Sequence, residues 1–237
     1  MVQSKRESMK RLENAVSDGK VDRQMMPVIG RLNELADYHT TSSCAGRINL
    51  FEIKSFGEKG TLNILGKWHE PVGPKAFLAA ARAHKANELW LKAEPPILHV
   101  VCSNFDSARR LLTAAYSAGF KSSSIKSGGK SFMVEITSTE HLELPLGKGG
   151  RLMVDRKYLD FLLRTANSKL RRSQEKLERL KKELAGFTQK RQAPTEEQIS
   201  KALEKIRKHM VIVPCEPGQK KKECRQLTKK LQKSKKK

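Results

Sequence analysis

The sequence of 237 residues lacks the marks of membrane and exported proteins. No apolar run approaches the roughly 18 residues that a membrane-spanning helix requires. The first residues, MVQSKRESMKRLENAV, are charged throughout and contain no apolar signal-peptide core. These absences predict a soluble, cytoplasmic protein that does not enter a membrane.

Cysteine and aromatic residues are also scarce. No two of the four cysteines have CxxC spacing, so we expect no metal site, and a chain of this length without export signals needs no disulfide. The four are Cys44, Cys102, Cys215 and Cys224. Aromatic residues make up 5% of the chain, which argues against a broad base-stacking platform for single-stranded nucleic acid.

Positive charge, by contrast, is abundant. The net charge is +23 and the pI is about 10.1, which favours a polyanionic partner because bound cations release its counterions. Residues 219–237 hold ten Lys or Arg against one acid, Glu223, so they contribute +9 and leave +14 on residues 1–218. This tail is too charged to form a core and is expected to be disordered when free. The rest of the chain is basic enough to bind nucleic acid without it.

Predicted helices and strands alternate along the chain. Helical spacing covers residues 3–16, 25–35, 74–87 and 107–118, and strands are expected at 48–53, 62–68, 88–93, 97–102, 131–137, 142–146 and 151–154. Residues 54–60 and 122–130 are expected to be loops. No predicted strand is followed by the Gly-rich loop of a Rossmann fold. The pattern predicts an α/β or α+β class, with a single non-Rossmann mixed-sheet domain and flanking helices.

The longest helical segment runs from residue 158 to residue 184. Its apolar and small residues step alternately by four and three positions, which makes one seam: Leu159, Leu163, Ala166, Leu170, Ser173, Leu177, Leu180 and Leu184. Packing on its own domain is favoured over a coiled coil with a partner, because Ala166 and Ser173 weaken the seam. We therefore expect a domain over residues 1–187. Residues 188–237 form a basic extension with a helix at about 195–210, where TEEQ (195–198) fits a capping box.

The densest polar cluster is TTSSCAGR (40–47). Ser and Thr compete with the backbone for hydrogen bonds, so the run is predicted to be a loop that presents donors to an anion. Ser42, Ser43 and Cys44 supply hydroxyl and thiol groups, Gly46 allows close backbone approach, and Arg47 offers a fork for a carboxylate or phosphate. The alternative is an ordinary polar turn capped by a surface arginine.

Other polar residues could take part in chemistry. His99 lies in the apolar run PILHVVC, with its ring predicted to face opposite to Leu98 and Val100. With a carboxylate such as Asp22, or Glu94 at the bend before two prolines, it could perform acid–base work if the groups meet in space. A structural role is the alternative for a lone histidine in a strand.

Four residues are candidates for RNA contacts. Lys67, Trp68 and His69 could stack on and clamp a nucleobase, although for Trp68 alone a core position is favoured. Lys130 stands in GGKS (128–131), which resembles the end of a P-loop. The first glycine of that motif would fall at Ser124, so the motif is broken. A cysteine phosphatase is also excluded, because only two residues separate Cys44 from Arg47.

The run TTSSCAGR resembles the signature of the tRNA wybutosine-synthesising protein 3 family. Further blocks follow in the family's order: DGKVD (18–22), GKWHEP (66–71), EPPILHV (94–100), GFKSSSI (119–125), LELPL (142–146), and RLMV with YLDFLLRTAN (151–167). The resemblance covers roughly residues 5–185, is closer to the archaeal branch, and is absent from the tail.

The resemblance implies an unusual α/β fold and the cofactor S-adenosylmethionine. It implies methylation of ring nitrogen N4 of the wyosine-type base beside the anticodon of tRNA-Phe. It also implies a centre built from an aspartate, His99 and the loop residues Ser42, Ser43, Cys44, Gly46 and Arg47. Asp22 is the first choice of aspartate, with Asp37 and Asp160 as alternatives.

Two other classes of function remain open on the residues alone. A non-enzymatic RNA-binding or assembly protein accounts equally well for the charge and the tail. A hydrolase with Cys44 as nucleophile and His99 as base is the third hypothesis, and it predicts inactivation by thiol reagents.

Overall fold

The computed structural model describes residues 2–54, 62–127 and 131–188. By its internal contacts the chain divides into two units, Met1–Gln189 and Lys190–Lys237, and every described residue belongs to the first. Lys130, the helix predicted at 195–210 and the basic tail lie outside the described residues. The domain boundary predicted after residue 187 stays a prediction.

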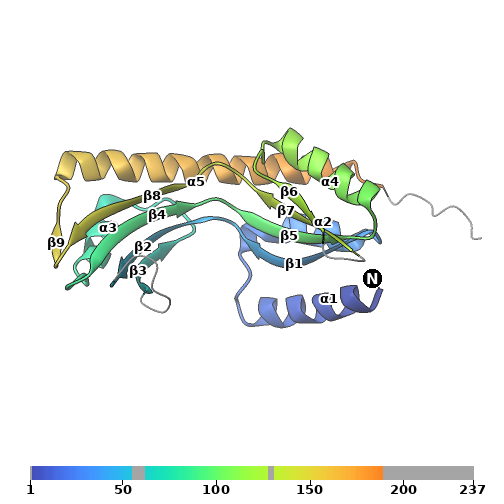
Figure 1. Ribbon diagram of the computed structural model, residues 1–237, viewed down its shortest axis with the longest axis horizontal. Coiled ribbons are helices and arrows are strands. Elements are labelled where there is room, and N and C mark those ends of the chain that lie inside the picture. The colour runs from blue at the N-terminus through green and yellow to red at the C-terminus, as the bar shows by residue number, and fades with distance from the viewer. Residues whose placement is uncertain (1, 55–61, 128–130, 189–237) are drawn as a thin grey trace, which may run out of the picture. The chain divides into compact units, whose positions relative to one another are not determined.

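The described residues form five α-helices, one short 3-10 helix and nine strands (Figure 1). The helices are α1 (Val2–Ser17), η1 (Arg23–Met25), α2 (Met26–Glu34), α3 (Pro74–Ala81), α4 (Phe105–Ala118) and α5 (Arg156–Ala185). The strands are β1 (Tyr38–Cys44), β2 (Arg47–Ile53), β3 (Leu62–Trp68), β4 (Glu88–Glu94), β5 (Ile97–Cys102), β6 (Ser124–Ser127), β7 (Phe132–Thr137), β8 (Leu142–Lys148) and β9 (Arg151–Leu152). The mixed helix-and-strand class and the long helix near residue 184 are confirmed.

The strands form two sheets rather than the single mixed sheet expected. Sheet A has the order β1-β5-β7-β6 and sheet B the order β3-β2-β4-β8-β9, and every pairing between described strands is antiparallel. A mixed sheet would contain some parallel neighbours, and β5 and β6, joined through α4, do run parallel. However, β7 lies between them and pairs antiparallel with both.

Three strands of sheet A are each joined directly by the chain to a strand of sheet B: β1 to β2, β5 to β4 and β7 to β8. The strands β1, β5 and β7 are neighbours in sheet A, and β2, β4 and β8 are neighbours in the same order in sheet B. The chain thus crosses between the sheets at Ala45–Gly46, at Pro95–Pro96 and within residues 138–141. We call this line the crossing. It brings TTSSCAGR and EPPILHV, which are distant in the sequence, side by side.

Local chemistry explains why the sheets separate at the crossing. Gly46 has φ +85°, a conformation that residues with a Cβ rarely adopt, and an added Cβ would lie 2.8 Å from the carbonyl oxygen of Glu94. Opposite it, Pro95 and Pro96 have no N–H to donate to a sheet ladder. The β1–β5 and β2–β4 ladders therefore stop on either side of these residues.

Helix α5 lies along one face of both sheets (Figure 1). Its first half belongs to a core with Ile48, Leu50, Leu91 and Phe77, and its second half to a core with Leu98, Val134 and α4. All eight residues of the predicted seam are buried, so packing within the domain is confirmed. The face of the sheets turned away from α5 is called the far face, and α1 packs against β1 on that side.

Three local predictions were wrong. The polar run at 40–47 is not a loop, because residues up to Cys44 form β1, whose backbone hydrogen bonds are supplied by β5. Residues 122–130 contain strand β6, held by β7. The helix predicted over 74–87 ends at Ala81, and the chain then turns toward β4.

Candidate active site

A chain of hydrogen bonds crosses sheet A on its far face. Ser42, His99 and Glu135 stand opposite one another on β1, β5 and β7. The Ser42 Oγ atom lies 2.6 Å from His99 Nδ1, and His99 Nε2 lies 2.8 Å from Glu135 Oε2. Lys126 on β6 donates to the same carboxylate oxygen at 2.6 Å. Ser42 is exposed and the His99 side chain is 25% exposed, so a substrate can contact the Ser42 end of this chain of hydrogen bonds.

The partners of His99 determine which of its ring nitrogens holds the proton. An ionised carboxylate only accepts hydrogen bonds, so Nε2–H donates to Glu135 and Nδ1 keeps a lone pair for the hydroxyl hydrogen of Ser42. The hydrogen bonds from Lys126 and His99 lower the pKa of Glu135 below its usual value, which keeps it ionised. The arrangement suits transfer of a proton from Ser42 to His99.

A second group of residues surrounds the backbone at the crossing itself. Asp22, from the segment before η1, accepts a hydrogen bond from the Ala45 N–H at 2.7 Å. His69 Nδ1 lies 3.1 Å from the carbonyl oxygen of Gly46 and 3.6 Å from Asp22 Oδ2. These contacts hold the turn between β1 and β2 in place. Burial raises the pKa of the neighbouring Cys44 thiol, against the smaller opposing effects of Gly46 and Arg47.

A network of ion pairs occupies the far face of sheet B. Arg47 Nε donates to Glu94 Oε2 at 2.7 Å, and Asn49 donates to the same oxygen at 2.8 Å. Lys92 lies 3.5 Å from Glu94 and 3.4 Å from Glu143. Burial alone would raise the pKa of Glu94, but Arg47 and Lys92 outweigh it and hold that pKa below its usual value.

The crossing brings together only some of the predicted residues. Ser42, Cys44, Gly46, Arg47, His69, His99 and Asp22 lie on it or beside it. Ser43 is opposite Leu98, and in a strand it faces the opposite way from Ser42, so the two hydroxyls cannot enter one site together. Of the alternative aspartates, Asp37 accepts from Ser103, and Asp160 pairs with Arg156 on α5.

The nucleobase clamp predicted from Lys67, Trp68 and His69 is divided between the two faces of sheet B. Lys67 is exposed opposite Asn49, whereas Trp68 packs against Phe77 with ring centroids 5.8 Å apart. The core position weighed for Trp68 is therefore the one observed. The His69 ring contacts the carbonyl oxygen of Gly46 instead of extending away from the strand.

Glu135 and Lys126 are functional candidates that the sequence reasoning missed. Lys126 falls in the segment expected to be a loop, and Glu135 in a strand assigned only to the sheet. The available signal was a single carboxylate in the otherwise apolar run FMVEIT (132–137). A lone acid in such a strand needs a partner, but the sequence alone does not reveal which strand supplies it.

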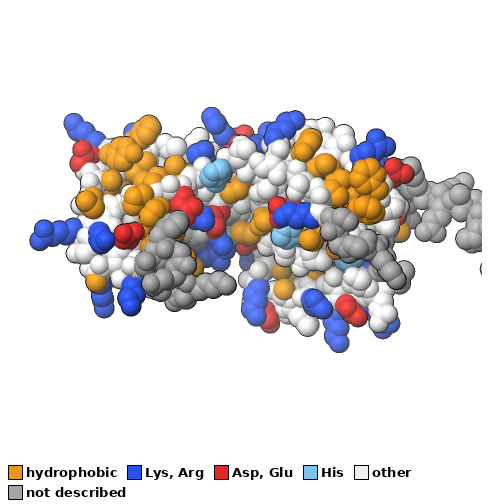
Figure 2. Space-filling model, in the orientation of Figure 1, with side chains coloured by type: hydrophobic (Ala, Val, Ile, Leu, Met, Phe, Trp, Pro, Cys, Tyr) orange, Lys and Arg blue, Asp and Glu red, His pale blue; other side chains and the backbone are white. Residues whose placement is uncertain are grey.

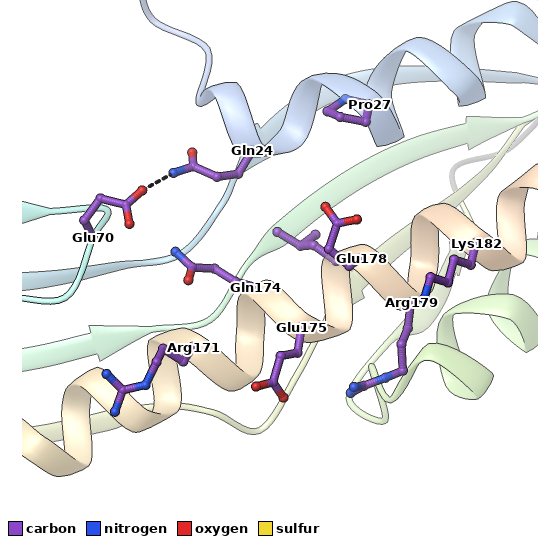
Figure 3. A pocket seen from close by; sticks show the side chains of 10 residues that line it. Gln24, Pro27, Glu70, Arg171, Gln174, Glu175, Glu178, Arg179 and Lys182 are labelled. Atoms are coloured by element: carbon purple, nitrogen blue, oxygen red, sulfur yellow. Dashed lines mark hydrogen bonds between the residues drawn. The ribbon is translucent and has the colours of Figure 1, made fainter.

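A groove of about 680 Å³ along α5 holds none of the predicted site residues (Figure 3). Gln24 donates to Glu70 at one side of it. Cations and acids alternate in its lining, with Arg171, Arg179 and Lys182 against Glu70, Glu175 and Glu178. The groove is therefore a poor match for a polyanion.

Known proteins share this architecture and sequence. The curated tRNA(Phe) 7-((3-amino-3-carboxypropyl)-4-demethylwyosine(37)-N(4))-methyltransferase 1 of Pyrococcus furiosus is 42% identical over 178 residues, covering 75% of this chain and 91% of the relative. The protein of the same name from Thermococcus kodakarensis is 41% identical over 183 residues, covering 77% and 92%. The solved structure of PH1069 protein from Pyrococcus horikoshii superposes with a TM-score of 0.74 at 39% identity, covering 77% and 94%.

Fold, site and relatives together define a methyltransferase whose sheets are not those of a Rossmann domain. The family model described as Methyltransferase TYW3 matches residues 3–186, and the chain belongs to that family. The family suggested by TTSSCAGR is thereby confirmed, as is the likeness to its archaeal members.

Proposed function

We propose that this enzyme methylates ring nitrogen N4 of a 4-demethylwyosine-type base in tRNA-Phe, next to the anticodon, with S-adenosylmethionine as methyl donor. The observation that carries the proposal is the chain from Ser42 through His99 to Glu135, which ends at an exposed hydroxyl close to the crossing. The curated relatives carry this activity in their names. Action in the cytoplasm belongs to the same proposal. Among the described residues, no helix is long and apolar enough to span a membrane.

The residues at the crossing suit the chemistry of the proposed cofactor. Its amino-acid end carries a carboxylate and an ammonium group, so a matching site needs charges of both signs. Arg47 and Glu94 supply them with side chains that are 35% and 28% exposed. The guanidinium of Arg47 would hold the carboxylate, and Gly46 lets the turn beside Arg47 pack closely against Glu94. When bound, the cofactor supplies an electrophilic methyl group.

The proton of the acceptor nitrogen must leave as the new bond forms. As N4 takes the methyl group from the cofactor's sulfonium, which would leave as a neutral thioether, Ser42 Oγ would accept the proton from N4. The Ser42 hydroxyl hydrogen passes in turn to His99 Nδ1. Glu135 then faces a protonated imidazole and stabilises its charge at 2.8 Å. Asp22 holds the turn that carries Cys44 and Gly46 and takes no proton in this scheme.

The cysteine hydrolase hypothesis is disfavoured by the same contacts. Both ring nitrogens of His99 are engaged, one by Ser42 and one by Glu135, so His99 does not serve as the base for Cys44. Burial also raises the pKa of the Cys44 thiol, which works against a thiolate nucleophile. A simple RNA-binding protein would need no such chain of hydrogen bonds on an exposed sheet.

Mass spectrometry of tRNA-Phe from a deletion strain tests this function. We expect the wyosine-type base to be replaced by a precursor lighter by one methyl group, and the wild-type gene to restore it. A strain carrying Ser42→Ala should accumulate the same precursor. An unchanged base in the deletion strain would refute the proposed function.

A further inference from the structure

Exposed aromatic side chains gather at the N-terminal end of α5, away from the candidate active site. Tyr158 and Phe161 are 49% and 54% exposed, and their rings stack with centroids 6.3 Å apart and planes at 25°. Leu152 and Met153, just before the helix, are 38% and 81% exposed. Isolated exposed apolar residues are common, but a contiguous group of this kind marks an interaction surface.

Positive charge is concentrated in the same part of the helix. Residues 156–172 hold six Lys or Arg against one acid, Asp160, for a net charge of +5. Residues 173–185 hold four against three, for a net charge of +1. Figure 2 shows hydrophobic side chains over the N-terminal turns of α5, with Lys and Arg at their margin. The aromatic and the cationic surfaces therefore coincide.

A shallow depression of about 340 Å³ joins the two kinds of side chain. Phe161 lines it together with Arg164, Lys169 and Arg172, and Thr165 and Ser168 complete it. None of these lining residues is acidic, unlike the groove in Figure 3, where cations and acids alternate. Aromatic faces beside unopposed cations suit unstacked bases and phosphates.

We propose that Tyr158, Phe161, Arg164, Lys169 and Arg172, the α5 patch, form a second RNA contact that binds the substrate tRNA outside the active site. The α5 patch deepens the proposed function and rests on it for the identity of the RNA. Helix α5 packs on the face of sheet A that carries Leu98 and Val100, opposite to His99. A tRNA is comparable in size with this chain, so one RNA can contact both places. The patch adds affinity through stacking and phosphate contacts, and the crossing performs the chemistry.

Binding of an unmodified tRNA-Phe transcript to the full chain, measured by fluorescence anisotropy over a range of salt, tests the α5 patch. We expect Phe161→Ala to weaken binding about tenfold, as the loss of one base–aromatic stack does. Arg164→Glu should weaken it similarly and reduce the slope of log affinity against log salt by about one. Lys182→Glu, the same charge change in the balanced groove, is the matched control and should change affinity less than about threefold.

An RNA contact at the α5 patch requires that the patch variants lose affinity and that the control variant keeps it. Unchanged affinity in Phe161→Ala, or equal losses in Arg164→Glu and Lys182→Glu, would overturn the proposal. So would a dimer seen by light scattering that Phe161→Ala dissociates, because a second copy would then cover the patch. In methylation assays the patch variants should raise KM for tRNA and leave kcat unchanged.

The same experiments keep the two proposals apart. If the wild-type chain methylates tRNA while the patch variants bind RNA normally, the proposed RNA contact is refuted and the proposed function is supported. If the variants lose RNA affinity but the wild-type chain transfers no methyl group, the RNA contact is supported and the proposed function is refuted.

Discussion

Sheets A and B are joined by the same three connections of the chain, yet the side chains on their far faces differ in chemistry. On sheet A, Ser42, His99 and Glu135 form a chain that can accept a proton. On sheet B, Arg47 and Lys92 form ion pairs with Glu94. Histidine is the side chain suited to proton exchange near neutrality, whereas a carboxylate paired with cations holds a ligand or a strand in place. We therefore propose that sheet A carries the catalytic residues and sheet B the residues that bind the cofactor.

Removing the imidazole from sheet A should give the largest effect. His99→Ala is expected to slow methyl transfer by about 10² to 10⁴, the usual contribution of a general base. Calorimetric affinity for S-adenosylmethionine should stay within about twofold of wild type, since His99 lies on the other sheet. A rate within about threefold of wild type would remove His99 from the mechanism.

Removing the guanidinium from sheet B should weaken cofactor binding instead. Arg47→Ala is expected to reduce calorimetric affinity for S-adenosylmethionine about 10- to 100-fold, as the loss of a charged hydrogen bond does. Lys92→Ala removes the other cation beside Glu94 and serves as control, with an expected change below about threefold. If Arg47→Ala leaves cofactor affinity unchanged, its guanidinium binds RNA.

Glu135→Gln tests whether the acid positions His99. The amide keeps the shape but lacks the charge that stabilises a protonated imidazole, so we expect roughly a tenfold fall in kcat. Nitrogen NMR of the His99 ring should show the proton on Nε2 in the wild type and a mixture of tautomers in the variant. An unchanged tautomer together with an unchanged rate would make Glu135 a bystander.

The pairing of Glu94 predicts a pH dependence of stability rather than of chemistry. Its pKa is lowered in the folded chain, so its contribution is complete above the ordinary value of 4.5 and is lost as the pH falls through the lowered pKa. Between neutral pH and about pH 3, Glu94→Gln should therefore lose less unfolding free energy than wild type. Urea unfolding at both pH values measures this, and equal losses would contradict the pairing.

Cys44 should give the smallest effect, although it lies at the centre of the signature. Cys44→Ala is expected to retain methyl transfer within about twofold, because burial raises the pKa of the thiol and the neighbouring Asp22 carboxylate raises it further. Peptide mapping after alkylation should show slower modification of Cys44 than of a free thiol. Loss of turnover in Cys44→Ala with intact cofactor binding would restore a covalent mechanism.

The sequence revealed strands β5 and β7 of the site, but neither β1 and β6 nor which strands are neighbours. The strand predicted for the apolar run PILHVVC correctly placed His99 opposite to Leu98 and Val100, because successive side chains of a strand face opposite sides. The order β1-β5-β7 is a tertiary property, so the pairing of His99 with Ser42 and Glu135 was not visible. The serines of TTSSCAGR favour a loop by their own preferences, but these are weak, and pairing with β5 makes the segment a strand instead.

The most direct test is methyl transfer by the purified full chain. Labelled S-adenosylmethionine is incubated with tRNA-Phe that carries the 4-demethylwyosine-type base, and the digested nucleosides are analysed by mass spectrometry. We predict one labelled methyl group on N4 with the wild-type chain and almost none with His99→Ala. Label on another position, or no label with a chain that binds both cofactor and tRNA, would contradict a methyl-transfer site at the crossing of the two sheets.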